Sequence, residues 1–126
     1  MYASKLIVSN NPQVQAAYAQ RFLVDFVSGS YLEVLERVRD RIHQGDILLT
    51  HPLSGSVKPK ETPYKSVVLA PGEKLQWESL QLIEDAIVVV RNLQKDEIAR
   101  MHDPALLTDF QTIDLTLLRS ALSDKE

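Results

Sequence analysis

The residues best suited to chemistry lie in one polar loop between two apolar runs. The loop contains His51, a Ser54-Gly55-Ser56 turn and two lysines, Lys58 and Lys60. Glycine permits unusual backbone angles, so this turn can present consecutive amides and two hydroxyl groups to an anion, and the lysines add positive charge. The pattern predicts a binding site for an anionic metabolite or nucleotide, with an ordinary solvated turn as the alternative. It matches neither a G-x-x-x-x-G-K-[ST] phosphate loop nor a G-x-G-x-x-G fingerprint.

His51 gives a second hypothesis, because it directly follows an apolar run and can act as a general acid or base near neutral pH. On this interpretation the protein is a small enzyme that uses His51 together with Lys58 or Lys60. The structural alternative is that the ring hydrogen-bonds across the loop and Pro52 fixes the turn. The sequence leaves both open.

Composition excludes several other classes of protein. Hydrophobic residues make up 44% and charged residues 25% of the 126 residues, which is typical of a single globular domain over residues 1–126. No cysteine occurs and the three histidines lack zinc-site spacing, so we expect neither a metal nor a cofactor. The net charge of −3 does not favour nucleic-acid binding. No apolar run approaches the ~18 residues of a membrane span, so we expect a soluble cytoplasmic protein.

Apolar runs and helical periodicity predict the elements that hold this loop. Short apolar runs predict strands at residues 5–8, 22–27, 46–50 and 65–70. Apolar spacing predicts helices at residues 12–20, 31–43 and 74–93, and from residue 104 onward. Because strands and helices alternate, we predict a single three-layer α/β domain with a small, mainly parallel sheet of about four strands flanked by helices. The direction of the fourth strand stays open, since 14 residues are only marginally long for a parallel crossover.

The ends of these strands place the predicted site. In parallel α/β sheets, ligands bind outside the carboxyl ends of the strands. Asn10 and Asn11 follow the first strand, residues 28–30 follow the second, and Thr50 and His51 follow the third. We therefore predict that the ligand is bound by Asn10, Asn11, Thr50, His51, Ser54, Gly55, Ser56, Lys58 and Lys60.

The helix at residues 74–93 is unusually apolar. The run 87–90 alone would suit a strand, but no turn separates it from the helical pattern before it, so we favour one long helix. Its apolar residues cover nearly the whole circumference, and such a helix must be buried on all sides. We therefore predict a homodimer with the C-terminal helices at or near the interface. The alternative is that the terminal helix folds back and completes the core of the monomer.

Several segments together resemble one protein family. These are residues 48–59 and 61–66, Ser9-Asn10-Asn11-Pro12, Gly29-Ser30-Tyr31-Leu32, Asp109-Phe110 and Ile113-Asp114-Leu115. They are similar to the GrdX family, small bacterial proteins associated with the glycine reductase system of amino-acid-fermenting anaerobes. The resemblance implies an accessory protein linked to glycine, sarcosine and betaine reductase, with glycine reductase components as partners. It assigns no catalytic residue.

Overall fold

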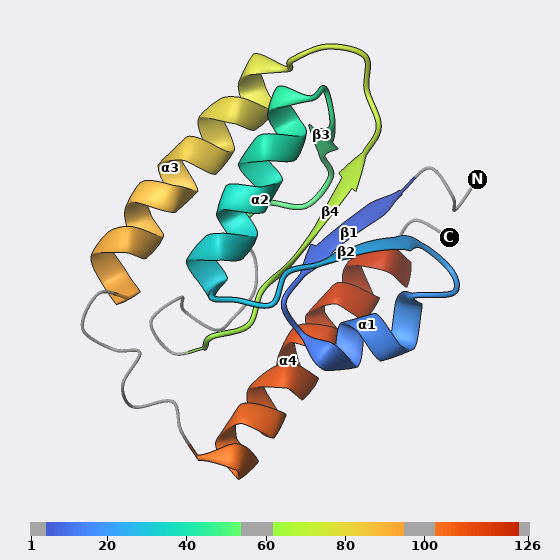
Figure 1. Ribbon diagram of the computed structural model, residues 1–126, viewed down its shortest axis with the longest axis vertical. Helices are drawn as coiled ribbons and strands as arrows, with labels where there is room; N and C mark the ends of the chain where they lie inside the picture. The colour runs from blue at the N-terminus through green and yellow to red at the C-terminus, as the bar shows by residue number, and fades with distance from the viewer. Residues whose placement is uncertain (1–4, 54–61, 95–102, 124–126) are drawn as a thin grey trace.

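A computed structural model describes residues 5–53, 62–94 and 103–123, which form four helices and four strands (Figure 1). Each predicted helix and strand occurs. In chain order they are β1 (Leu6–Ser9), α1 (Pro12–Tyr18), β2 (Leu23–Phe26), α2 (Tyr31–His43), β3 (Ile47–Leu48), β4 (Ser66–Ala70), α3 (Trp77–Gln94) and α4 (Pro104–Ser123).

The four strands form one mixed sheet in the order β2-β1-β4-β3. β1 pairs with β2 in parallel, whereas β4 pairs antiparallel with both β1 and β3. The prediction of a mainly parallel sheet is therefore wrong. β1, β2 and β3 do point the same way, but β4 enters between β1 and β3 in the opposite direction, and this one strand makes two of the three pairings antiparallel.

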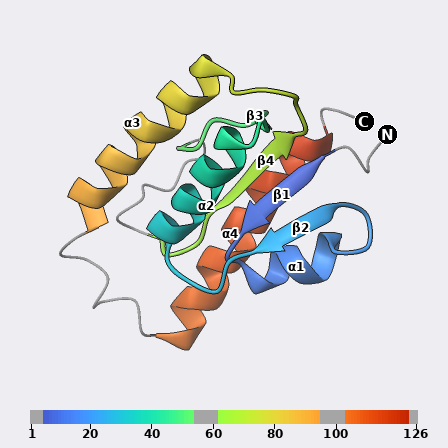
Figure 2. The same ribbon diagram turned by 45° about the horizontal axis from the view of Figure 1, so that its top comes forward.

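Two clusters of buried apolar side chains lie on opposite faces of the sheet. Leu6, Val8, Val67 and Leu69 belong to the cluster that includes residues of α2 and α3. The alternate residues Ile7 and Val68 belong to the cluster that includes residues of α1 and α4. Figures 1 and 2 show the two helix pairs on the two sides of β1 and β4. The central strands are buried on both faces, which explains why they read as continuous apolar runs.

Side-chain caps fix where the helices begin. The Asn11 side chain accepts a hydrogen bond from the Gln13 amide at 3.0 Å, and Pro12 occupies the first turn of α1. Ser30 and Glu33 form a capping box at the start of α2. The carboxylate of Asp103 accepts from the amide of Ala105 at 3.0 Å and caps α4. The predicted caps Asn11, Ser30 and Asp103 are thus confirmed.

Two glycines allow the end of α2 to lie close against the turn between β4 and α3. Gly45 has φ +112°, a conformation that side chains rarely adopt, and a β-carbon there would lie 2.9 Å from the carbonyl oxygen of Gly72. A β-carbon at Gly72 would in turn collide with the carbonyl oxygen of Gly45. This close backbone approach brings the segment before β3 against the turn that follows β4.

Residues 87–90 lie inside α3, so the prediction of one long helix is correct. Ile83, Ala86, Ile87 and Val90 are buried at helical spacing, whereas Val88 is 56% exposed. The apolar residues that cover nearly the whole circumference of this helix are therefore only partly buried.

Candidate functional site

Asn10 ties together the chain segments at one end of the sheet. Its side-chain amide nitrogen donates to the carbonyl oxygens of Gly29 at 2.9 Å and Pro63 at 2.8 Å. Its side-chain oxygen accepts from the backbone amide of Lys65 at 2.9 Å. Asn10 is 6% exposed, so these bonds form away from solvent. The residue therefore acts here as a structural link between the ends of β1, β2 and β4.

Asn11 and Asp114 connect α4 to the sheet. The side-chain nitrogen of Asn11 donates to Asp114 Oδ2 at 3.0 Å and to the carbonyl oxygen of Gln111 at 2.8 Å. Ser66 Oγ donates to the same Asp114 oxygen at 2.7 Å and lies 2.7 Å from Ser9 Oγ. These contacts fix the carboxylate of Asp114 against the start of β4.

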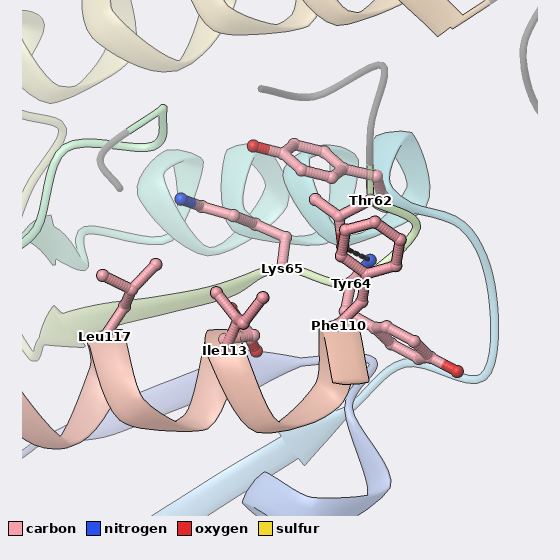
Figure 3. A pocket seen from close by; sticks show the side chains of 8 residues that line it. Thr62, Tyr64, Lys65, Phe110, Ile113 and Leu117 are labelled. Atoms are coloured by element: carbon pink, nitrogen blue, oxygen red, sulfur yellow. Dashed lines mark hydrogen bonds between the residues drawn. The ribbon is translucent and has the colours of Figure 1, made fainter. Parts of the chain in front are cut away.

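Two adjoining cavities lie between β4 and α4, and we refer to them together as the α4 cavity. The narrow part, about 20 Å³, is lined by Tyr31, Thr62, Tyr64, Lys65, Phe110, Ile113, Asp114 and Leu117 (Figure 3). The wider part, about 250 Å³, is lined by Thr50, Lys65, Ser66, Asp114, Leu117, Leu118, Ser120 and Ala121. Lys65, Asp114 and Leu117 line both parts. Figure 3 shows Ile113 and Leu117 rising from α4 on the side where Lys65 extends from the start of β4.

Lys65 is a cationic side chain in a place where few water molecules reach it. The residue is 6% exposed, and its ammonium lies 6.0 Å from the centre of the Tyr31 ring. Burial lowers the pKa of Lys65 to about 8, and the nearby charge of Asp114 opposes this shift. Burial and the charge of Asp114 both raise the pKa of Tyr31, so its hydroxyl stays protonated. At pH 7 the α4 cavity therefore contains a lysine that is mostly charged.

The predicted ligand residues separate into four groups. Thr50 lines the wider part of the α4 cavity, and its hydroxyl oxygen accepts from the Val68 amide at 3.1 Å. Asn10 and Asn11 lie beside the cavity with their side chains in the structural bonds described above. His51 is exposed and is not among the residues that line the cavity. Five further predicted residues, Ser54, Gly55, Ser56, Lys58 and Lys60, lie outside the described residues.

The ring of His51 accepts a hydrogen bond from the backbone amide of Leu53 at 3.0 Å through Nδ1. A hydrogen bond of this kind is expected if His51 has a structural role and its ring stabilises the turn that contains Pro52. The bond occupies one ring nitrogen as an acceptor, so in this state that nitrogen does not carry a proton.

Sequence reasoning missed Lys65 and Asp114 as site residues. Each had a signal in the sequence. Lys65 lies two residues before the apolar run 67–70, and Asp114 interrupts the apolar residues Ile113 and Leu115 of a helix. Charged residues at such positions are rarely buried without a structural or functional reason.

No group of three or more His, Cys, Asp or Glu side chains is arranged to hold a metal ion within residues 5–53, 62–94 and 103–123. In the same ranges no helix has both the length and the apolar character of a membrane span.

Comparison with known proteins gives one match. The model of a protein family described as "GrdX-like protein" matches residues 6–123, nearly the whole chain. No curated protein and no solved structure shows a significant match.

Proposed function

This chain belongs to the GrdX-like protein family, and from that premise we propose that it is a small accessory protein that binds an anionic molecule in the α4 cavity. The observation that carries the proposal is the buried ammonium of Lys65, which lines both parts of the cavity. An ammonium with little access to water interacts strongly with a carboxylate or phosphate, because the local dielectric constant is low.

The rest of the lining supports a small, partly polar ligand. Thr50, Ser66 and Ser120 add hydroxyl groups to the wider part of the cavity, and Tyr31 and Thr62 add hydroxyl groups to the narrow part. A volume of about 250 Å³ is below the roughly 300–1,000 Å³ of sites for drug-sized ligands. A metabolite of a few carbon atoms therefore fits better than a nucleotide. The anion-binding role of His51, Ser54, Gly55, Ser56, Lys58 and Lys60 remains a prediction from the sequence.

Replacing Lys65 by methionine tests this function. We expect Lys65→Met to weaken the binding of small carboxylates or phosphate by at least about tenfold, because the variant keeps the volume of the side chain but removes its charge. Thermal shift with and without 10 mM of each anion measures the effect as the ligand-induced change in Tm. This difference is the relevant quantity, since removing a buried charge also changes the stability of the free protein.

Two controls make the Lys65 experiment decisive. Lys74→Met removes an exposed lysine near the start of α3 and should leave anion binding unchanged. In the unaltered protein, affinity should fall as the pH rises above about 8, because the ammonium that binds the anion loses its proton there. If no carboxylate or phosphate shifts the Tm of the unaltered protein at pH 7, the proposed function is wrong.

We further propose, from the family, that the protein works in the cytoplasm beside components of the glycine reductase system. We also propose that it forms a homodimer. Exposed apolar side chains on the C-terminal helices support the dimer: Val88, Val89 and Leu93 on α3, and Leu106, Ile113 and Leu117 on α4. Among the described elements α3 packs mainly on α2, and its exposed Val88 and Val89 offer an apolar surface for a second copy.

Sedimentation velocity at micromolar concentration tests the dimer. We expect a species of twice the 14.2 kDa monomer mass. The variant Val88→Lys should shift it toward the monomer, because a lysine placed in an apolar interface loses its hydration. The exposed polar position Gln15 on α1, across the sheet from α3, provides the control Gln15→Lys, which should leave the dimer intact. A single 14.2 kDa species that is unchanged on dilution contradicts the proposal.

A further inference from the structure

The α4 cavity carries charges of both signs on facing elements. Lys65 directly precedes β4 and Asp114 lies in the middle of α4, and both line the narrow and the wider part. A simple anion in this cavity meets the attraction of Lys65 together with the repulsion of Asp114. A simple cation meets the opposite pair of effects. The charges of the lining are therefore best matched by a ligand that itself carries both signs.

The carboxylate of Asp114 is positioned to receive a cationic group. Its Oδ2 accepts hydrogen bonds from Asn11 at 3.0 Å and Ser66 at 2.7 Å, which hold the side chain in one orientation. Its second oxygen, Oδ1, accepts no hydrogen bond among the residues that the structure describes. An ammonium group at Oδ1 would thus add a charge-assisted bond without displacing an existing one.

The wider part of the cavity has an apolar wall on α4. Leu117, Leu118 and Ala121 of α4 contribute there, and the hydroxyl groups of Thr50, Ser66 and Ser120 lie around them. Such a wall favours a short hydrocarbon group, because burying apolar surface away from water is favourable.

We propose that the ligand of the α4 cavity is a zwitterion, an α-amino acid with a short apolar side chain, whose carboxylate binds Lys65 and whose ammonium binds Asp114. This inference rests on the proposed function, since it names the class of molecule that carries the anionic group bound by Lys65. The two charged groups of an α-amino acid are fixed on one carbon atom, so a site with one fixed cation and one fixed anion selects both at once.

Matched ligands test the proposal on the unaltered protein. Alanine is compared with propionate, which lacks the ammonium, and with ethylamine, which lacks the carboxylate. Leucine is compared in the same way with 4-methylpentanoate and 3-methylbutylamine. By isothermal titration calorimetry at pH 7, we expect each amino acid to bind at least about tenfold more tightly than its two partners. Leucine should bind more tightly than alanine.

The variant Asp114→Asn gives opposite changes for the two ligand types. It should weaken the binding of the amino acids by at least about tenfold, because the ammonium loses its charged partner. It should strengthen the binding of propionate and 4-methylpentanoate, because the repulsion between two carboxylates is removed. A merely structural role of Asp114 would weaken the binding of all of them. Asp109→Asn, on an exposed position of the same helix, is the matched control.

The outcomes separate this inference from the proposed function. If the simple carboxylates bind the unaltered protein as tightly as the amino acids, the zwitterion is wrong and anion binding stands. If neither type binds, the proposed function fails as well. The ligand comparison needs no variant, so it decides the inference even if Asp114→Asn does not fold.

Discussion

Replacing Asn10 by alanine should lower the free energy of unfolding by about 3–5 kcal/mol. The side chain makes three hydrogen bonds, to the carbonyl oxygens of Gly29 and Pro63 and from the amide of Lys65. Alanine makes none of them, and each buried backbone group left without a partner costs about 1–3 kcal/mol. Urea denaturation followed by circular dichroism measures the loss as a change in midpoint at constant slope.

The variant Asn10→Asp tests the two hydrogen bonds that Asn10 donates separately from the one that it accepts. It keeps the size of the side chain and an oxygen for the Lys65 amide, but it places a second oxygen against the two carbonyl oxygens. We expect it to be at least as destabilising as Asn10→Ala. Asn92→Ala, at an exposed position of α3, serves as the control and should change the stability by less than about 0.5 kcal/mol. A loss below about 1 kcal/mol for Asn10→Ala would mean that water replaces the amide in these bonds.

Ile87→Ala should lower the free energy of unfolding by about 3–4 kcal/mol. Ile87 is 0% exposed and belongs to the cluster between the sheet and the α2–α3 pair. Truncating a fully buried isoleucine removes its transfer free energy and leaves a cavity, which together cost about 2–5 kcal/mol. The same urea titration provides the measurement.

Neighbouring valines give internal controls for the Ile87 prediction. Val88→Ala should cost less than about 1 kcal/mol, because Val88 is 56% exposed. Val89, 38% exposed, should also be tolerant, whereas Val90, 0% exposed, should not. In a strand, residues 87 and 89 would share a face and respond alike. Equal losses for Ile87→Ala and Val89→Ala would therefore contradict the helix.

The helices could be predicted from the sequence because their signals are local. Asn11 with Pro12, and Ser30 with Glu33, cap their helices within three residues, so no distant part of the chain is needed to recognise them. The sheet pairing could not be predicted in the same way. A parallel and an antiparallel β4 bury the same apolar residues, and the choice depends on the path of the chain between β3 and β4, which periodicity does not contain.

The candidate site could be predicted only in part, because it too depends on contacts between distant parts of the chain. Thr50, Asn10 and Asn11 were expected near the ends of the strands, and they lie in or beside the α4 cavity. The charged residues Lys65 and Asp114 were not expected there. Their proximity arises from the packing of α4 against β4, elements that are far apart along the chain. A sequence pattern shows the type of a residue, but it does not show which distant helix covers it.

The central position of β4 has a consequence for the order of events during synthesis. β1 lies between β2 and β4, and the facing residues Ser9 and Ser66 are 57 positions apart. At ~5–20 residues per second, a ribosome needs about 3–11 seconds to add that length of chain. Throughout that interval β1 has an unpaired edge with apolar side chains on both faces, the kind of edge that recruits other strands. The nascent chain is thus most prone to aggregation just before β4 emerges, and a chaperone that covers β1 at that stage would raise the yield of folded protein.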